Sequence, residues 1–177
     1  MKFISFNHDN SEKFGIIENN LITDLTGKID GALSLKELIK IKKIKDAKEY
    51  AKSNPGSIKP DEIKYSPLIP NPGKIICVGL NYSEHVKETN RTVEENPVIF
   101  HRFPESQTAH MQAIQRPTVS ESLDFEGEMA VVMDEGGKHI KPEDALKHIV
   151  GFSCYNESTI REWQRHTRQF GMGKNFE

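Results

Sequence analysis

Two glutamates separated by a single residue form the first group in this sequence that could perform chemistry. Glu126 and Glu128 lie in the segment LDFEGEMAVVM, residues 123–133, whose pattern predicts a β-strand. Side chains two apart on a strand share a face, with Cα atoms about 6.5 Å apart, so both carboxylates could bind one Mg²⁺, Mn²⁺ or Ca²⁺ ion. Residues 130–133 are all apolar, which predicts that the strand enters a core. On the pair alone, the alternative interpretation is the solvent face of an amphipathic strand.

A second candidate group is the pair His85 and Glu88 in the segment HVKE. On the helix predicted for residues 81–90, side chains three apart are neighbours, and the carboxylate could orient and charge the imidazole. A histidine arranged in this way is what a general base requires. The alternative interpretation is an ordinary pair on the surface of a helix.

The segment CYNESTIREWQ offers a third acidic residue, Glu157, at a junction between a predicted strand and a predicted helix. Arg161 and Gln164 follow it by four and seven residues, which would place them on its helix face, where they could bind a substrate carboxylate. Alternatively, Glu157 lies in the first helical turn because of the helix dipole. Trp163 is expected in the core.

A lysine in the segment GMGKNF is the last candidate. Lys174 lies between glycines and Phe176, in a loop whose backbone allows close approach to a ligand. A lysine in that position could bind an oxyanion, although most lysines in such loops are solvated. The segment therefore predicts a possible substrate contact.

The elements that must position these residues follow from periodicity and turn signals. Residues 14–25 predict a hairpin that turns at Asn19 and Asn20, where a positive φ is tolerated. The stretch 54–74 holds five of the nine prolines and predicts a linker or an extended crossing that separates a small N-terminal unit from the rest. The remaining expected elements are helices at 34–43, 45–54, 142–149 and 158–170, and strands at 74–80, 96–103 and 150–158.

Charge and composition exclude several classes of protein. A formal net charge of -2 gives no reason to expect nucleic-acid binding. No apolar run approaches the roughly 20 residues of a membrane span, and the N-terminus turns polar too soon for a signal peptide. Cys77 and Cys154 lack metal-type spacing and are expected to be buried thiols. We therefore expect a cytoplasmic protein.

The order of these motifs is more specific than any one of them. GLNY-x2-H-x2-E, PV-x-F, LDFEGE, NE-x3-R-x2-Q and GK-x-F occur in that sequence, and over about residues 66–177 they closely resemble the fumarylacetoacetate hydrolase family. The resemblance implies a mixed α+β, strand-dominated fold. Residues 66–177 would be the N-terminal portion of a β-roll catalytic domain, and residues 1–65 a small α/β N-terminal domain.

The resemblance also implies roles for individual residues. It implies that Mg²⁺ or Mn²⁺ is bound by Glu126, Glu128 and Glu157. His85 and Glu88 would lie on a segment that orders over the substrate. The groups on the substrate side would be Arg161, Gln164, Lys174 and Arg102.

Three features depart from the family pattern. The family usually has aspartate where this chain has Glu157, and the extra methylene could shift the metal geometry. Arg102 stands where a lysine is common, which keeps the charge but changes the donor geometry. The printed sequence stops at Glu177, whereas family members continue through a glycine-rich loop. We therefore expect that the C-terminal part of the catalytic domain is lacking.

The expected function is a divalent-metal-dependent hydrolase or lyase that cleaves a C–C bond of a 2-oxo or 2,4-dioxo carboxylic acid through a metal-stabilised enolate. Decarboxylation and enol–keto isomerisation pass through the same enolate and remain alternatives. A truncated, non-catalytic remnant is the other alternative. The resemblance further implies a homodimer, with a small oxo-acid substrate and no nucleic-acid or membrane partner.

Overall fold

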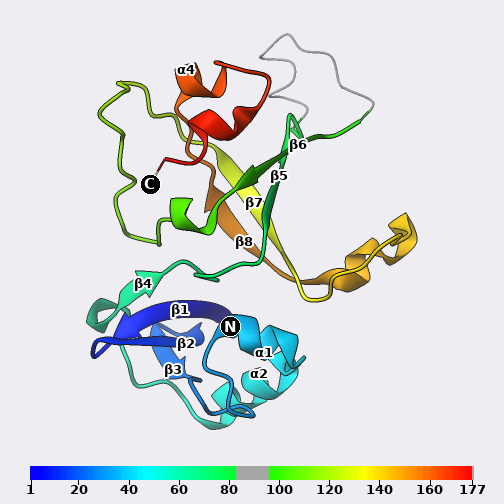
Figure 1. Ribbon diagram of the computed structural model, residues 1–177. Helices are drawn as coiled ribbons and strands as arrows, with labels where there is room; N and C mark the ends of the chain where they lie inside the picture. The colour runs from blue at the N-terminus through cyan, green and yellow to red at the C-terminus, as the bar shows by residue number, and fades with distance from the viewer. Residues whose placement is uncertain (83–95, 177) are drawn as a thin grey trace. The chain divides into compact units, whose positions relative to one another are not determined.

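The computed structural model describes residues 1–82 and 96–176 as two compact units (Figure 1). The chain passes between the units more than once. The first unit comprises Met1–Pro70, Thr108–Ala113 and Gly127–Tyr155, and the second comprises Asn71–Gln107, Ile114–Glu126 and Asn156–Glu177. Over the described residues as a whole, more of the chain lies in strands than in helices, which confirms the expected strand-dominated, mixed α+β class. A domain boundary at residue 65 stays a prediction.

A four-stranded sheet with the order β3-β2-β1-β4 forms the centre of the first unit (Figure 1). Its neighbouring strands are antiparallel. Asn19 and Asn20 make the turn between β2 and β3 with φ values of 51° and 61°, so the predicted hairpin is confirmed. The strands are β1 (Lys2–His8), β2 (Ser11–Glu18), β3 (Leu21–Asp24) and β4 (Lys64–Ser66).

Strand β4 lies inside the stretch that was predicted to be a linker or an extended crossing, and the linker interpretation is wrong at this point. Residues 64–66 pair with β1, and a 3₁₀ turn, η1 (Pro60–Glu62), precedes them. Ser5 Oγ also donates a hydrogen bond of 2.7 Å to the carbonyl oxygen of Leu68. The prolines flank the strand and do not interrupt it, which is how an edge strand tolerates them.

Two helices complete the core of the first unit. Helix α1 (Leu35–Lys40) begins after Ser34, whose hydroxyl accepts a hydrogen bond from the Glu37 amide, and α2 (Ile44–Ser53) follows. Both helices were predicted. Their apolar faces and the sheet bury one cluster, with Leu38 completely inaccessible to solvent. Burial of each large side chain there contributes about 1.5–3 kcal/mol.

Strands β7 (Gly127–Met133) and β8 (Ile149–Asn156) form a separate pair in the first unit. A 3₁₀ segment, η3 (Pro142–His148), precedes β8 and starts with its proline, as the sequence predicts. The prediction that β7 enters a core is wrong for one face, because Met129 is 61% exposed and Met133 is 53% exposed. Only the alternate side chains are shielded, and Val132 packs against the core.

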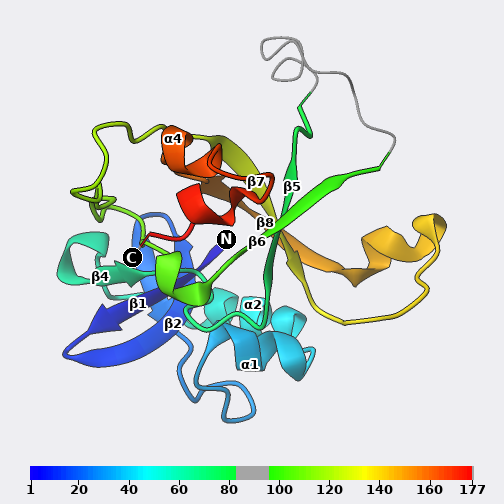
Figure 2. The same cartoon turned by 45° about the horizontal axis from the view of Figure 1, so that its top comes forward.

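The second unit contains the antiparallel pair β5 (Ile75–Gly79) and β6 (Val98–Arg102), both predicted (Figure 2). It also contains η2 (Pro104–Ser106), α4 (Arg161–Gln164) and η4 (Phe170–Gly173). The helix predicted over 158–170 is therefore much too long. Thr159 pairs in a β-bridge before α4, and the Thr167 hydroxyl accepts from the Gln169 amide after it, so both flanks are held in non-helical conformations.

Two further expectations concern the burial of the two cysteines and the length of apolar helices. Cys77 is half-buried, but Cys154 is exposed, so the prediction of two buried thiols is wrong for Cys154. Within residues 1–82 and 96–176, no helix has both the length and the apolar character that a bilayer crossing requires.

Candidate metal centre

A short antiparallel ladder in the second unit brings two of the predicted metal ligands together. Asp124 and Thr159 exchange two backbone hydrogen bonds, each 2.9 Å long. The Glu157 amide then donates to the Glu126 carbonyl at 2.8 Å, and the Glu126 amide donates to Asn156 Oδ1 at 3.1 Å. Both sides of the ladder are fixed through the backbone, so the carboxylates of Glu126 and Glu157 converge.

The three predicted metal ligands form one acidic group. One oxygen from each of Glu126, Glu128 and Glu157 lies within 4.8 Å of the others, and Glu128 follows Glu126 by two residues along the chain. A cation with bonds of 2.0–2.6 Å holds its oxygen ligands roughly 3–5 Å apart, so this spacing fits Mg²⁺ or Mn²⁺. The group therefore has the donor atoms and the spacing of a divalent-metal site.

The burial of Glu157 gives a second reason to infer a cation. Glu157 is 5% exposed, and its Oε1 has no hydrogen-bond partner among the described residues. Its nearest cationic atoms are Lys174 Nζ at 3.3 Å and Arg102 Nη1 at 3.6 Å. A buried carboxylate oxygen without a hydrogen bond is costly, and a bound cation would satisfy it.

Lys174 is the most deeply buried charge in the group, with 2% of its surface exposed. Its Nζ donates to both oxygens of Glu126, at 3.0 and 2.9 Å, and lies 5.1 Å from the centre of the Phe100 ring. The alternative of a solvated loop lysine is therefore wrong, because Lys174 is buried and contacts the acidic group. Its role toward a substrate stays a prediction.

Gly173 explains how the chain can place Lys174 there. A Cβ at residue 173 would lie 2.4 Å from the Gln164 nitrogen and 2.5 Å from the Ile160 carbonyl oxygen. The Ile160 amide also donates to the Gly173 carbonyl at 2.9 Å. Backbone meets backbone at this point, so only glycine lets the turn η4 lie against the start of α4.

Arg161 borders the acidic group on another side. Its Nε and Nη2 each lie 2.7 Å from Asp124 Oδ2, while Nη1 lies 2.6 Å from Glu126 Oε1 and donates to Gln164 Oε1 at 3.1 Å. The prediction that Arg161 shares a helix face with Glu157 is wrong, because Glu157 precedes α4 and Arg161 reaches Glu126 instead.

Sequence reasoning missed Asp124 and Thr159. The Thr159 hydroxyl is buried and donates to Glu126 Oε1 at 2.8 Å, and it lies 3.0 Å from the Glu157 carbonyl oxygen. The signal for Asp124 was its position two residues before Glu126, on the same side of an extended chain. Thr159 has no comparable signal, because its role depends on a pairing distant in sequence.

The two central glutamates have opposite pKa shifts. Burial would raise the pKa of Glu126, but hydrogen bonds from Lys174 and Thr159 and the charge of Arg161 outweigh it and lower that pKa. Burial, together with the charge of Glu126, raises the pKa of Glu157 despite Lys174 and Arg102. The environment thus favours the charged form of Glu126 and disfavours that of Glu157.

Arg102 and Cys77 lie behind Glu157. Arg102 is buried, and its Nη1 donates to the Ser158 carbonyl at 3.1 Å as well as facing Glu157. Burial, and then the charge of Glu157, raises the pKa of Cys77 to about 12, so this thiol is unreactive near neutral pH. The Arg102 guanidinium thus contacts Ser158 and Glu157 of the protein itself. Substrate binding by Arg102 stays a prediction.

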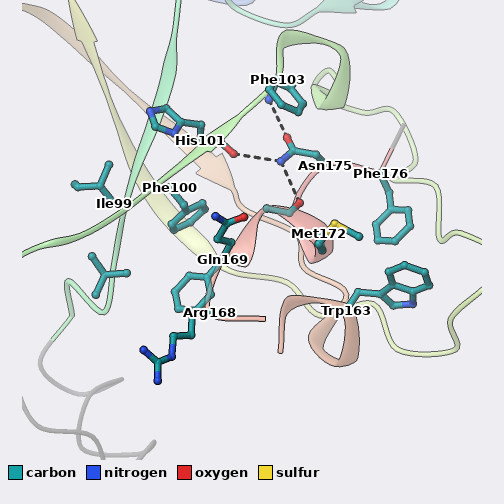
Figure 3. A pocket seen from close by; sticks show the side chains of 13 residues that line it. Ile99, Phe100, His101, Phe103, Trp163, Arg168, Gln169, Met172, Asn175 and Phe176 are labelled. Atoms are coloured by element: carbon teal, nitrogen blue, oxygen red, sulfur yellow. Dashed lines mark hydrogen bonds between the residues drawn. The ribbon is translucent and has the colours of Figure 1, made fainter. Parts of the chain in front are cut away.

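The second unit also has a hollow of about 740 Å³, and its wall includes Phe100, whose ring lies near Lys174 (Figure 3). Asn175 closes one side, since its amide donates to the His101 carbonyl at 3.2 Å and accepts from the Phe103 amide at 2.8 Å. Trp163 lines this hollow and is only half-buried, so its prediction as a core residue is wrong.

The predicted catalytic pair falls outside the part of the chain that the structure describes. His85 and Glu88 both lie within residues 83–95. Their role as the proton-transferring pair therefore stays a prediction. It rests on the spacing of the two residues and on the family pattern.

Comparisons with known proteins give matches in both sequence and fold. The sequence model described as "Fumarylacetoacetate (FAA) hydrolase C-terminal" matches residues 74–177. "Oxaloacetate tautomerase Fahd2a, mitochondrial" of Rattus norvegicus is 38% identical over 117 residues, which is 66% of this chain and 37% of that protein. "Oxaloacetate tautomerase fahd2, mitochondrial" of Xenopus laevis is 36% identical over 136 residues, covering 76% of this chain and 43% of the relative.

Solved structures share the fold along the full chain. The fumarylacetoacetate hydrolase of Exiguobacterium antarcticum superimposes with a TM-score of 0.83 and 29% identity, over 100% of this chain and 62% of that one. The chain thus spans less than two thirds of the relatives it matches. More than half of the residues match the family's sequence model, and the chain therefore belongs to the fumarylacetoacetate hydrolase family.

Proposed function

We propose that the protein is a divalent-metal-dependent enzyme that acts on a 2-oxo or 2,4-dioxo carboxylic acid through an enolate. The observation that carries the proposal is the group of three carboxylates within 4.8 Å of one another, bordered by the buried Lys174 and the half-buried Arg161. When bound there, Mg²⁺ or Mn²⁺ would supply Lewis-acid stabilisation to the enolate oxygen. Glu126, Glu128 and Glu157 would hold it.

The charges around the site fit an anionic substrate. Four carboxylates face three cationic side chains, which leaves one net negative charge. A divalent ion would turn this into one net positive charge, which attracts a carboxylate and repels a cationic ligand. The groups counted are Asp124, Glu126, Glu128 and Glu157 against Arg102, Arg161 and Lys174.

Each described residue has a task that its contacts support. Lys174 keeps Glu126 ionised and, being buried, offers a positive charge that water does not screen. The charge of Arg161 also favours the ionised form of Glu126. Outside the described residues, we propose that His85, paired with Glu88 as the family pattern implies, would remove the proton next to the carbonyl and return it to the enolate oxygen.

Enol–keto tautomerisation of a 2-oxo dicarboxylic acid is the reaction we favour. The support is the name shared by the curated relatives that are 36–38% identical, oxaloacetate tautomerase. The chain spans 37–43% of those relatives, so their activity enters here only as a proposal. Tautomerisation needs only one proton moved from carbon to oxygen, which a single base can do.

Hydrolysis of a C–C bond is the second candidate, and it is the reaction expected from the sequence. Its support is the 29% identical fumarylacetoacetate hydrolase that covers the whole chain. The two reactions share the enolate but differ in the need for an attacking water. They are therefore separable by product analysis.

The test is an assay of the purified protein with Mn²⁺ or Mg²⁺, using oxaloacetate and an acylpyruvate as substrates. Tautomerisation changes the enol absorbance without changing the composition, whereas hydrolysis of the acylpyruvate releases pyruvate and a carboxylic acid. We expect metal-dependent decay of the enol signal, lost on chelation and in Glu126→Gln. Activity that survives both treatments would overturn the proposal.

We also propose that the protein forms a homodimer. Exposed apolar side chains on β7 and β8, including Met129, Met133 and Phe152, offer surface of the kind that dimers bury. Light scattering should give twice the mass of the chain. A monomer at all concentrations would contradict this.

The compartment stays a prediction. The sequence led us to expect the cytoplasm, whereas the names of the curated relatives place those proteins in mitochondria. Fractionation of cells that express the tagged protein distinguishes the two locations.

A further inference from the structure

The backbone holds Asp124 in a fixed place beside the acidic group. Its amide donates to Thr159 and its carbonyl accepts from Thr159, both at 2.9 Å. Residue 124 therefore cannot shift along the ladder without breaking the pairing that also places Glu126 opposite Glu157. Its carboxylate is 44% exposed and points to Arg161 at the start of α4.

Most of the donor groups of Arg161 are already in use. Nε and Nη2 both contact one oxygen of Asp124 at 2.7 Å. Nη1 contacts Glu126 at 2.6 Å and Gln164 at 3.1 Å. An arginine side chain has several rotatable bonds, and an anchor on its Nε edge determines where the opposite nitrogen points.

We propose that Asp124 is a positioning residue that anchors Arg161, so that Nη1 of the guanidinium faces the metal-ligand carboxylate of Glu126. Asp124 acts through Arg161 and does not itself touch metal or substrate. The consequence for catalysis rests on the proposed function above, whereas the anchoring itself does not.

The inference changes the task of Arg161 as well. With Nε, Nη2 and Nη1 all engaged by protein oxygens, Arg161 has little left for a bidentate grip on a substrate carboxylate. It acts as a fixed positive charge beside Glu126. Loss of Asp124 would free the Nε edge and allow the side chain to turn into solvent.

The first experiment measures the anchoring without metal or substrate. Phenylglyoxal modifies accessible guanidinium groups, and peptide mass spectrometry gives its rate at each arginine. In Asp124→Ala we expect a several-fold faster modification of Arg161, with the exposed Arg168 as an internal reference that does not change. Asp144→Ala, which breaks an exposed pair with Lys147, is the matched control and should leave Arg161 as in the wild type. An unchanged rate at Arg161 in Asp124→Ala overturns the proposal.

The second experiment is a double-mutant cycle on Mn²⁺ affinity, measured by calorimetry. Asp124→Ala should weaken binding by about tenfold, as loss of an outer partner of a metal ligand does. In the Arg161→Ala background the same substitution should have no further effect, because Asp124 acts through Arg161. Additive losses, or a loss explained by a lower melting temperature, would overturn it. A wild-type protein that binds no Mn²⁺ would instead refute the proposed function and leave the modification result to decide the anchoring.

Discussion

The sheet with its two helices and the acidic group use opposite means to hold their side chains. In the first, Phe14, Leu25 and Leu38 are excluded from water by one another and need no polar partner. In the second, Glu157 and Lys174 are buried almost as deeply, but each carries a charge. Apolar burial stabilises by itself, whereas a buried charge is tolerated only beside an opposite charge.

The comparison teaches where the two regions are vulnerable. Removal of one apolar side chain from the core leaves a cavity, and the loss is limited to its contacts. Removal of one charge from the acidic group leaves its partners buried and unpaired. We therefore expect that loss of a cationic side chain such as Lys174 destabilises the metal centre as well as weakening its binding of metal.

Replacement of Lys174 by methionine should have the largest effect. It leaves Glu126 and Glu157 without their shared ammonium, and breaking a buried pair costs about 3–5 kcal/mol in the free energy of unfolding. Urea denaturation of the chelator-treated protein measures it. The control is Lys42→Met, which removes a lysine from a pair with Glu135 that is mostly in solvent and should be nearly silent. Equal effects of the two substitutions would refute the contrast between buried and exposed pairs.

Leu38→Ala tests the apolar core of the first unit. We expect a loss of about 2–4 kcal/mol in the free energy of unfolding, because the side chain is fully buried. Mn²⁺ affinity of the protein that remains folded should not change, since the core contains none of the site's residues. A parallel loss of metal affinity would show that the two regions are coupled.

Gly173→Ala tests the close backbone contact with Ile160 and Gln164 that places Lys174 in the acidic group. The new Cβ would meet backbone atoms at 2.4–2.5 Å, so the turn must shift, at a cost of about 1–3 kcal/mol. The melting temperature and the Mn²⁺ affinity should both fall. Gly136→Ala, where a Cβ meets no atom within 4 Å, is the matched control. A variant at 173 with wild-type stability would mean that the approach is looser than described.

The smallest effect should come from Glu157→Gln in the metal-free protein. The pKa of Glu157 is raised in the folded state, so ionising it opposes folding, and this cost grows as pH rises through the folded-state pKa. The glutamine variant should therefore melt higher than the wild type near neutral pH, with the difference shrinking below the unfolded-state pKa. The sign is reversed for Glu126, whose pKa is lowered and whose ionised form stabilises the fold. A variant that melts lower at neutral pH and recovers on acidification would contradict the assignment.

The first region could be predicted from the sequence because its elements are local. Turn residues predict the hairpin at Asn19 and Asn20, and a capping residue and apolar periodicity predict the helices after Ser34. Strand β4 could not be predicted, since three residues between prolines carry no pattern of their own. It exists because β1 offers an unpaired edge.

For the acidic group, the sequence predicted which residues belong to it but not the contacts that hold them. The E-x-E spacing and the motif order pointed to Glu126, Glu128 and Glu157, and the structure brings these three together. The anchor at Asp124, the hydroxyl of Thr159 and the short length of α4 depend on pairing between distant segments. No local pattern encodes such pairing, so the contacts of Arg161 could not be derived from spacing along a helix.

Calorimetric titration of Mn²⁺ into the chelator-treated protein tests the central claim most directly. We predict one saturable site per chain in the wild type, with binding lost in Glu126→Gln although circular dichroism shows a folded protein. Glu143→Gln, on the 3₁₀ segment before β8, should bind like the wild type. A wild type without saturable binding, or a folded Glu126→Gln variant with unchanged affinity, would show that these carboxylates do not form a metal centre.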